Sequence, residues 1–403
     1  MTVDLPPEIL AEIFSLLPVK SVLRFRSTSK SLRSLIDSHN FINLHLRKSL
    51  NRSLILRLNT DLYQFDEDFS NLTTAVPLNH PFLRHSTNIT LLGSCNGLLC
   101  ISNGEIDFSN PYDKNEITFW NPNICKHRII PFLPIPIPPR RSEPDDINFA
   151  YCVHGFGFDP LTSDHKLLRI SWSFDQQLST FDSHVRLFSS KNNSWKIIPR
   201  MPYALYYAQT MGVFVHNSLH WIMTKELDGL HPCLIVAFNL TLEIFNQVPL
   251  PAEIGQKNFE ISVSVLGGCL CMVVDYQTSD VDVWVMKEYR SRDSWCKLFT
   301  LVKSCFTSSL KSLGVLGCSS DGRKVLLQGI NDLKLFWYDL KSEQITYVEG
   351  IPNFDEAMFC VGSLVPPSFP VVNCKKENLC KLRCQTTSKR RDDFLSQGFK
   401  LRL

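Results

Sequence analysis

The chain lacks the features that mark membrane and secreted proteins. Its longest nearly apolar run, Ile261–Val274, covers about 14 residues, whereas a membrane-spanning helix needs about 20. Near the N-terminus, Asp4 and the pair Pro6–Pro7 stand where a secretion signal has a basic start and an apolar run. We therefore expect a soluble protein without a membrane span, located in the cytoplasm, the nucleus or both.

The chain also lacks a strong net charge. Its 403 residues carry +3, which does not indicate a nucleic-acid partner. Nine Lys or Arg and three Asp or Glu lie from Cys374 to the C-terminus, so residues 373–403 are expected to form a basic, disordered tail. Its two basic clusters have the spacing of a bipartite nuclear signal, although such runs are common in solvated tails. The clusters are Lys375 and Lys376, then Lys389, Arg390 and Arg391.

The 14 cysteines contain no Cys-x-x-Cys pair, so we expect reduced thiols, mostly in the core. Three patterns still resemble reactive or metal sites. Gly93–Gly97 matches a nucleophile elbow with Cys95, but the elbow needs a following helix and Asn96–Gly97 is a hairpin signal. His216 and His220 have the spacing of a helical metal pair, in a segment that alternates like a hairpin.

The third pattern is a group of tail cysteines without a fourth ligand nearby. They are Cys374, Cys380 and Cys384. Because each pattern has a simpler structural explanation, we expect no catalytic residue, metal or cofactor.

The first 48 residues are predicted to form short helices. Pro6 and Pro7 suit the start of the first, and Pro18 ends it. A second helix is expected from Ser21, a third around Leu32–Ile36 and a fourth from Asn40. The first helix is apolar on too many sides for a surface helix. A module this small cannot bury that surface alone, so it must pack on the following domain or on another protein.

Period-2 alternation, typical of half-buried strands, begins after about residue 50. A bulky residue recurs seven positions after an aromatic one, with turn-forming residues between them, and an apolar hairpin precedes each copy. The copies are Trp120 with His127, Phe188 with Trp195, Phe238 with Phe245, Tyr338 with Ile345, and a looser one, Met286 with Trp295. Successive copies lie 68, 50, 48 and 52 residues apart. Four-strand units at this period are typical of a β-propeller.

The repeat predicts an all-β domain over residues 49–372, a six-bladed, kelch-like β-propeller with seven blades possible. A closing blade would join the early strands Leu54–Leu58 and Leu62–Phe65 to the late strand Phe359–Val365. The low glycine content, 17 of 403, counts against a propeller, and a curled β-sandwich array stays open as an alternative. The proline-rich insert Pro131–Pro144 is expected to be an extended surface loop.

The segment DLPPEILAEIFSLLPVKSVLRFRSTSKSLRSLID, residues 4–37, closely resembles an F-box. Much of the rest resembles the plant F-box-associated interaction domain, in defence-regulator and S-locus-like proteins. The matching pieces include GSCNGLLCI at 93–101, FWNP at 119–122, HGFGFDPLTSDHKLLRI at 154–170, NSWKIIP at 193–199 and VDVWVMKEY at 281–289. The resemblance implies a small all-α F-box, residues 1–48, followed by the propeller.

The resemblance further implies a non-catalytic substrate receptor of a Skp–cullin–F-box ubiquitin ligase. Its F-box would bind a Skp-type adaptor, and through it cullin, and its propeller would hold a protein target for ubiquitination. The adaptor-binding residues implied are Leu5, Pro6, Ile9, Leu10, Ile13, Leu17, Pro18, Val22 and Leu23. The family usually has Cys, Val and Trp at Ser27, Thr28 and Leu32, which puts adaptor affinity in doubt.

Three functions therefore compete: a degradation receptor in plant defence or one for secreted nucleases, a non-degradative scaffold with a weakened F-box, and an enzyme. We find no constellation of acids or triad for an enzyme. Target-binding residues are not identified by the sequence, although loops on one propeller face are expected to carry them.

Overall fold

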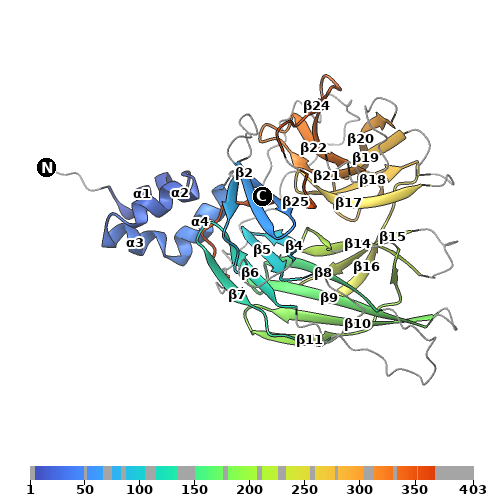
Figure 1. The fold of residues 1–403 in the computed structure, drawn as a ribbon, viewed down its shortest axis with the longest axis horizontal. Helices are drawn as coiled ribbons and strands as arrows, with labels where there is room; N and C mark the ends of the chain where they lie inside the picture. The colour runs from blue at the N-terminus through green and yellow to red at the C-terminus, as the bar shows by residue number, and fades with distance from the viewer. Residues whose placement is uncertain are drawn as a thin grey trace.

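The computed structural model describes most of the chain. The described residues are 5–49, 52–66, 75–82, 88–104, 115–134, 150–175, 180–206, 211–225, 233–254, 259–276, 280–303, 313–329, 334–351 and 353–367. Figure 1 shows a small helical domain attached to one side of a larger β domain. Among the described residues, no helix has the length and apolar content to cross a membrane. The tail, with its basic clusters and cysteines, lies outside the described residues, as does most of the proline-rich insert.

Four helices form the N-terminal domain. They are α1 (Pro7–Phe14), α2 (Val19–Arg26), α3 (Lys30–Ile36) and α4 (His39–Lys48). Ser29 and Ser38 cap α3 and α4, because their hydroxyls accept hydrogen bonds from backbone amides three residues later. The second helix begins two residues earlier than predicted, since Pro18 itself is its N-cap. Proline suits this position because it has no backbone amide to leave unpaired.

The β domain has six antiparallel sheets within the described residues, arranged as blades. Blade 1 contains β25 (Glu356–Val361), β1 (Arg52–Leu58), β2 (Asp61–Asp66) and β3 (Val76–Leu78). Blade 2 contains β4 (Thr90–Cys95), β5 (Leu98–Ser102), β6 (Ile117–Asn121) and β7 (Lys126–Ile129). Blade 3 contains β8 (Ala150–Asp159), β9 (Asp164–Asp175), β10 (Thr180–Ser189) and β11 (Ser194–Ile198).

The other three blades follow in chain order. Blade 4 contains β12 (Ala204–Leu205), β13 (Val213–Val215), β14 (Ser218–Thr224), β15 (Leu234–Asn239) and β16 (Ile244–Val248). Blade 5 contains β17 (Glu260–Leu266), β18 (Cys269–Asp275), β19 (Asp280–Met286) and β20 (Trp295–Val302), with a short 3-10 helix at Arg292–Ser294. Blade 6 contains β21 (Leu313–Cys318), β22 (Lys324–Gly329), β23 (Leu335–Asp339) and β24 (Ile345–Tyr347).

The six blades close into a ring, which confirms the six-bladed propeller. The inner strands contact one another in the order β4, β8, β13, β17, β21, β25 and back to β4. The closing blade forms as predicted, because β25 from the end of the chain pairs with β1 from its start. Closure removes the free sheet edges that an open array would expose.

The seven-residue frame has a direct structural cause. In each outer hairpin the two residues of a predicted copy lie opposite each other, as in Trp120 with His127. Few glycines are needed because a polar side chain caps the turn. The Asn239 side chain, for example, accepts the amides of Thr241 and Leu242 at 3.0 and 2.7 Å, and Glu243 then takes a positive φ of 56°.

Candidate functional site

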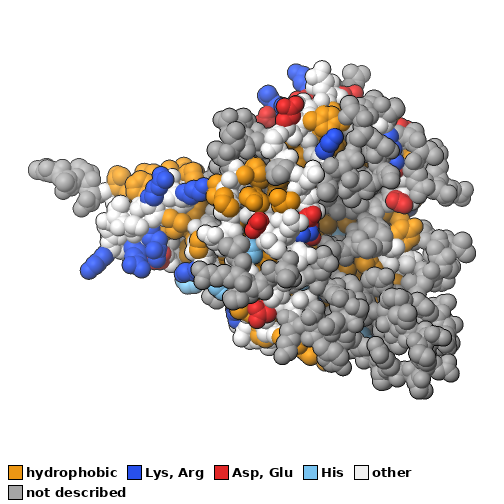
Figure 2. Space-filling model, viewed as in Figure 1, with side chains coloured by type: hydrophobic (Ala, Val, Ile, Leu, Met, Phe, Trp, Pro, Cys, Tyr) orange, Lys and Arg blue, Asp and Glu red, His pale blue; other side chains and the backbone are white. Residues whose placement is uncertain are grey.

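An apolar stripe runs along the outer side of α1. It consists of Ile9 and Ile13, which lie four positions apart on one face of the helix, and of Leu5 and Leu16, which lie just beyond its two ends. Between 46% and 70% of each residue is exposed, although large apolar side chains on a small domain normally pack into a core. Figure 2 shows hydrophobic side chains gathered on the helical domain next to Lys and Arg. This surface, which we call the α1 stripe, is fitted for contact with another protein.

The predicted adaptor-binding residues fall into three groups. Leu5, Pro6, Ile9, Ile13 and Pro18 are exposed. Leu10, Leu17 and Leu23 are half-buried against the core. Val22 is fully buried, so it supports the helices from within and has no surface to offer a partner.

Two residues outside the predicted adaptor-binding set also belong to the exposed apolar surface. Leu16 is 70% exposed and Phe25 is 40% exposed. The Phe25 ring stacks on the buried ring of Phe14 at a centroid distance of 4.9 Å, which links α2 to α1. Helical spacing after Ile13 already placed Leu16 on the stripe, whereas no local pattern indicated that Phe25 stays accessible.

The three departures from the F-box pattern lie near the end of α2 and in α3. Ser27 and Thr28 are exposed, and their hydroxyls donate to the carbonyls of Leu23 and Phe25 at 3.3 and 2.8 Å. Leu32 is half-buried against the core of the helical domain. Each departure is therefore accommodated within the helical domain without an unpaired polar group.

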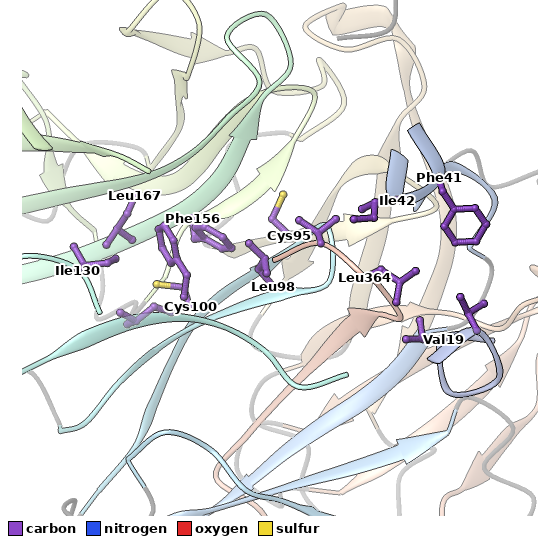
Figure 3. Close-up of a cluster of buried hydrophobic side chains, with 14 of the residues drawn as sticks. Val19, Phe41, Ile42, Cys95, Leu98, Cys100, Ile130, Phe156, Leu167 and Leu364 are labelled. Carbon is purple, nitrogen blue, oxygen red and sulfur yellow. The ribbon is translucent and has the colours of Figure 1, made fainter. Parts of the chain in front are cut away.

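The opposite side of the helical domain is packed on the propeller. Phe41 and Ile42 of α4 belong to one buried cluster with Leu98 of β5 and with Leu364. Figure 3 shows these side chains converging where α4 meets the segment after β25. The junction thus covers α4 and leaves the α1 stripe exposed.

Hydrogen bonds reinforce the junction through residues 362–367, which we call the strap. The buried Asn121 side chain donates to the carbonyls of Ser363 and Val365 at 3.0 and 2.8 Å. Gly97 lies so close that a Cβ there would fall 2.1 Å from the Cβ of Ser363. The strap therefore fixes the helical domain against blade 2.

The propeller end away from the helical domain carries the longest connections. In blade 2 the turns between β4 and β5 and between β6 and β7 lie at the helical end, next to the strap. Antiparallel order places the equivalent turns of blades 3, 5 and 6 at this end too, and the other connections at the opposite end. The connection from Ile129 to Ala150 is the longest of these. Its described root is held by Trp195, whose indole N–H donates to the carbonyl of Pro131 at 2.8 Å. Long loops on a rigid scaffold suit recognition of a partner.

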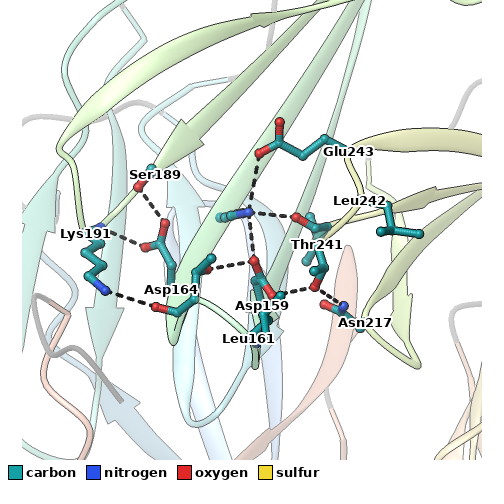
Figure 4. A network of polar contacts seen from close by, with 12 residues as sticks. Asp159, Leu161, Asp164, Ser189, Lys191, Asn217, Thr241, Leu242 and Glu243 are labelled. Atoms are coloured by element: carbon teal, nitrogen blue, oxygen red, sulfur yellow. Dashed lines mark hydrogen bonds and ion pairs between the residues drawn. The ribbon is translucent and has the colours of Figure 1, made fainter. Parts of the chain in front are cut away.

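A polar network joins blades 3 and 4 (Figure 4). Lys166 Nζ lies 2.9 Å from Asp159 Oδ2 and 3.5 Å from Glu243 Oε1, and it donates to the carbonyl of Leu240 at 2.7 Å. Burial raises the pKa of Asp159, but hydrogen bonds from Thr241, Thr162 and Lys166 outweigh burial and hold it below its ordinary value. All of these groups belong to the propeller itself, so the network stabilises the contact between blades 3 and 4.

The patterns that resemble reactive sites prove structural where the structure describes them. Cys95 ends β4, Asn96 and Gly97 make the turn to β5, and burial raises the pKa of the Cys95 thiol far above its usual value. The two ring nitrogens of His220 lie 3.0 Å from the Val213 carbonyl and 2.8 Å from the Tyr289 hydroxyl. Neither nitrogen is left for a metal. No group of three or more potential metal ligands occurs among the described residues.

Comparison with known proteins identifies both domains. Residues 3–44 match the family model of the F-box domain, and residues 50–355 match that of the F-box associated beta propeller domain. Among curated proteins of Arabidopsis thaliana, F-box protein CPR1 is 33% identical, over 98% of this chain and 99% of its own. F-box protein At4g22390 is 30% identical over 99% and 100%, and F-box/kelch-repeat protein At3g23880 is 26% identical over 83% and 87%. The chain belongs to the family of F-box proteins with an F-box associated β-propeller, and it is a substrate-recognition protein of that kind.

Proposed function

We propose that this protein is the substrate receptor of a Skp–cullin–F-box ubiquitin ligase. The observation that carries the proposal is the exposed α1 stripe, which remains uncovered although α4 of the same domain is packed on the propeller. A Skp-type adaptor would bury this stripe and connect the chain to cullin. Residues 1–48 would act as the F-box and residues 49–372 as the target-binding propeller, in the cytoplasm, the nucleus or both.

The mechanism is proximity. A target held by the propeller raises the effective concentration of its lysines near the charged conjugating enzyme, which supplies the covalent chemistry. Such a receptor needs only two binding surfaces with a fixed separation. The packed junction between α4 and the strap supports this role, because it holds the F-box in one position on the propeller.

Target recognition is proposed for the propeller end opposite the F-box, where the long connections gather. On the resemblance to defence-regulator F-box proteins, we propose a role in plant defence; an S-locus-like receptor for secreted nucleases is the alternative. A non-degradative scaffold is a second candidate function, because Ser27, Thr28 and Leu32 depart from the usual F-box residues.

Binding to a purified plant Skp-type adaptor tests the proposal. Co-purification and calorimetry would compare the wild type with the double variant Ile9→Asp, Ile13→Asp. The matched control is Leu242→Asp, which makes the same kind of change at an exposed leucine, 64% accessible, on blade 4. Circular dichroism would verify that all three chains fold. We expect binding by the wild type and the control, and its loss in the double variant.

The opposite result is equally informative. If the well-folded wild type does not bind adaptor, or the double variant binds as tightly, the α1 stripe is not an adaptor surface and the ligase proposal fails. Degradation and scaffolding are separated in plant cells by proteasome inhibition. A receptor predicts that its bound target accumulates on inhibition, whereas a scaffold predicts unchanged target levels.

A further inference from the structure

A row of residues crosses blade 3 on the side that faces blade 2. Its members lie directly opposite one another on the four strands: His154 on β8, Arg169 on β9, Arg186 on β10 and Ile197 on β11. Directly opposed residues of antiparallel strands share one face of the sheet. Phe156, two positions after His154, contacts Phe119 of blade 2 at a ring distance of 4.6 Å, which identifies that face. We call these four residues the cationic row.

Arg169 is buried, with no counter-charge among the described residues. The residue is 6% exposed, and its guanidinium donates to the carbonyls of Leu133 and Pro134 at 2.5 and 3.1 Å while lying 5.2 Å over the Trp195 ring. Its Nε has no hydrogen-bond partner among the described residues. Arg186, directly opposite, donates to the Val185 carbonyl at 3.1 Å. In the described part of the chain, no carboxylate forms an ion pair with either arginine.

Strand β9 also carries a second buried cation, Lys166, which does have carboxylate partners. Lys166 is 5% exposed and forms ion pairs with Asp159 and Glu243. Buried charges without such partners are costly, and like charges directly opposite each other are destabilising. Among the described residues, blade 3 therefore pairs the buried Lys166 with carboxylates and offers none to Arg169 and Arg186.

His154 is a second residue of the row whose polar atoms lack hydrogen-bond partners among the described residues. It is 2% exposed and neither ring nitrogen has a hydrogen-bond partner among the described residues. Burial, reinforced by the charge of Arg169, lowers the pKa of His154 to about 3, so its ring is neutral at physiological pH. A neutral ring keeps one N–H donor. An unpaired polar side chain this deeply buried indicates a missing partner or ligand.

The row ends at the propeller rim in an exposed apolar side chain, and a second one lies in the segment bound to β11. Ile197 is 71% exposed and Phe132, in the segment held by Trp195, is 48% exposed. Arginine beside bulky apolar side chains is typical of the residues that dominate protein interfaces. Arg186 is half-buried between Ile197 and the deeper Arg169.

We propose that the cationic row, with Phe132, binds an acidic segment of a protein partner. A carboxylate of that segment pairs with the half-buried Arg186 and is attracted through space by the charge of the deeper Arg169, and an adjacent apolar side chain packs on Ile197 and Phe132. The proposal rests on the proposed function in that this partner is the target recruited by the propeller. It assigns an acidic, apolar-containing peptide as the recognised class.

A library of displayed random peptides, about 12 residues long, selected against the full-length chain, is the probe. The best binder would be synthesised with its acidic residues and with the matching amides. The test variant is Arg186→Gln, and the control is Lys341→Gln, an exposed lysine on the outer turn of blade 6. We expect acidic peptides to be enriched. Their affinity should fall at least about tenfold in the variant and on amide replacement, without additivity.

Two results would overturn the proposal. One is enrichment of peptides without acidic residues, or equal affinity of Arg186→Gln and wild type, with circular dichroism confirming that the variant folds. The other is an internal counter-charge from Glu143, Asp145 and Asp146, which belong to the connection between Pro134 and Ala150. In that case their amide variant would destabilise the chain non-additively with Arg169→Gln, and the wild type would bind no acidic peptide.

The outcome is independent of adaptor binding. The Ile9→Asp, Ile13→Asp chain keeps the cationic row, so it should bind the acidic peptide as the wild type does. If the wild type binds the adaptor but no acidic peptide, only the proposal for the cationic row is contradicted. If the wild type binds the acidic peptide but no adaptor, only the ligase proposal is contradicted.

Discussion

The hydroxyl of Ser49 donates a 2.8 Å hydrogen bond to the backbone carbonyl of Gly362, 313 positions further along the chain. The residue that follows α4 is thereby tied to the segment that follows the last propeller strand. Both are buried where the F-box meets blades 1 and 2. Closure of the propeller and attachment of the F-box thus depend on the same few residues, which makes the junction a clear target for mutation.

Asn121→Ala is expected to lower the free energy of unfolding by about 1–3 kcal/mol. The substitution leaves the carbonyls of Ser363 and Val365 buried without their donor. Urea unfolding followed by circular dichroism measures the change. Asn123→Ala, in the same turn, is the control, because that position contributes a backbone amide that alanine retains. Equal stability of the two variants would show that Asn121 does not hold the strap.

Val22→Ala and Ile13→Ala should separate the core of the F-box from its surface. Val22 is fully buried, so the loss of two methyl groups should cost about 2 kcal/mol of stability. Ile13 is 46% exposed, so its replacement should change stability by less than about 0.5 kcal/mol. Thermal and urea unfolding of the full chain test both values. A destabilising Ile13→Ala would mean that the α1 stripe is part of the folded core.

Asp159→Ala is expected to cost about 3–5 kcal/mol, because it leaves Lys166 buried without its closest carboxylate. The double variant Asp159→Leu, Lys166→Met should lose much less stability than the sum of the losses in Asp159→Leu and Lys166→Met measured singly. A double-mutant cycle in urea measures this coupling. Lys196→Met is the control: Lys196 pairs with Glu243 at the surface, where a pair contributes at most about 1 kcal/mol. Additive losses would show that Asp159 and Lys166 are not coupled.

Acidification should destabilise the propeller through His220. Burial lowers the pKa of His220 to about 4 from an ordinary 6.5. The unfolded chain therefore binds a proton that the folded chain does not, and stability present above pH 6.5 is lost as the pH falls toward 4. His220→Gln should reduce the slope of stability against pH by up to about 1.4 kcal/mol per unit in this window. Urea unfolding at pH 7, 6 and 5 provides the measurement.

His127→Gln serves as the control for the pH series, because this side chain is exposed in blade 2. It should keep the wild-type slope. An unchanged slope in His220→Gln would mean that burial of the ring does not exclude the proton.

Much of the fold is local in origin and was predictable. The seven-residue spacing of Phe188 and Trp195 follows from a strand, a four-residue turn and a return strand, all of which neighbouring residues specify. The pairing of the first and last strands was predictable too, because an unclosed propeller would expose both edges. The second helix was placed two residues late, since Pro18 was interpreted as the end of a helix when it also starts the next.

The binding surfaces were less accessible to prediction. Val22 and Ile13 are both apolar residues of short amphipathic helices, and their spacing does not distinguish a buried position from an exposed one. Which of them faces outward depends on how α1, α2 and α3 pack together. The family resemblance placed both in the adaptor-binding set, but it does not say whether a residue acts by contact or by supporting its neighbours.

The sequence by itself indicated the two domains, the family and a propeller of six blades with seven possible, because the motifs and the repeat lie within tens of residues. Closure of the ring in the tertiary structure settled the number at six. The tertiary structure decided which apolar residues stay exposed, how Ser49 is bonded to Gly362 of the strap, and where Arg169 lies opposite Arg186 with no counter-charge among the described residues. Burial and ion pairing depend on the residues that surround a side chain in space. In a closed ring those neighbours come from separate turns and opposite ends of the chain, so no local pattern specifies them.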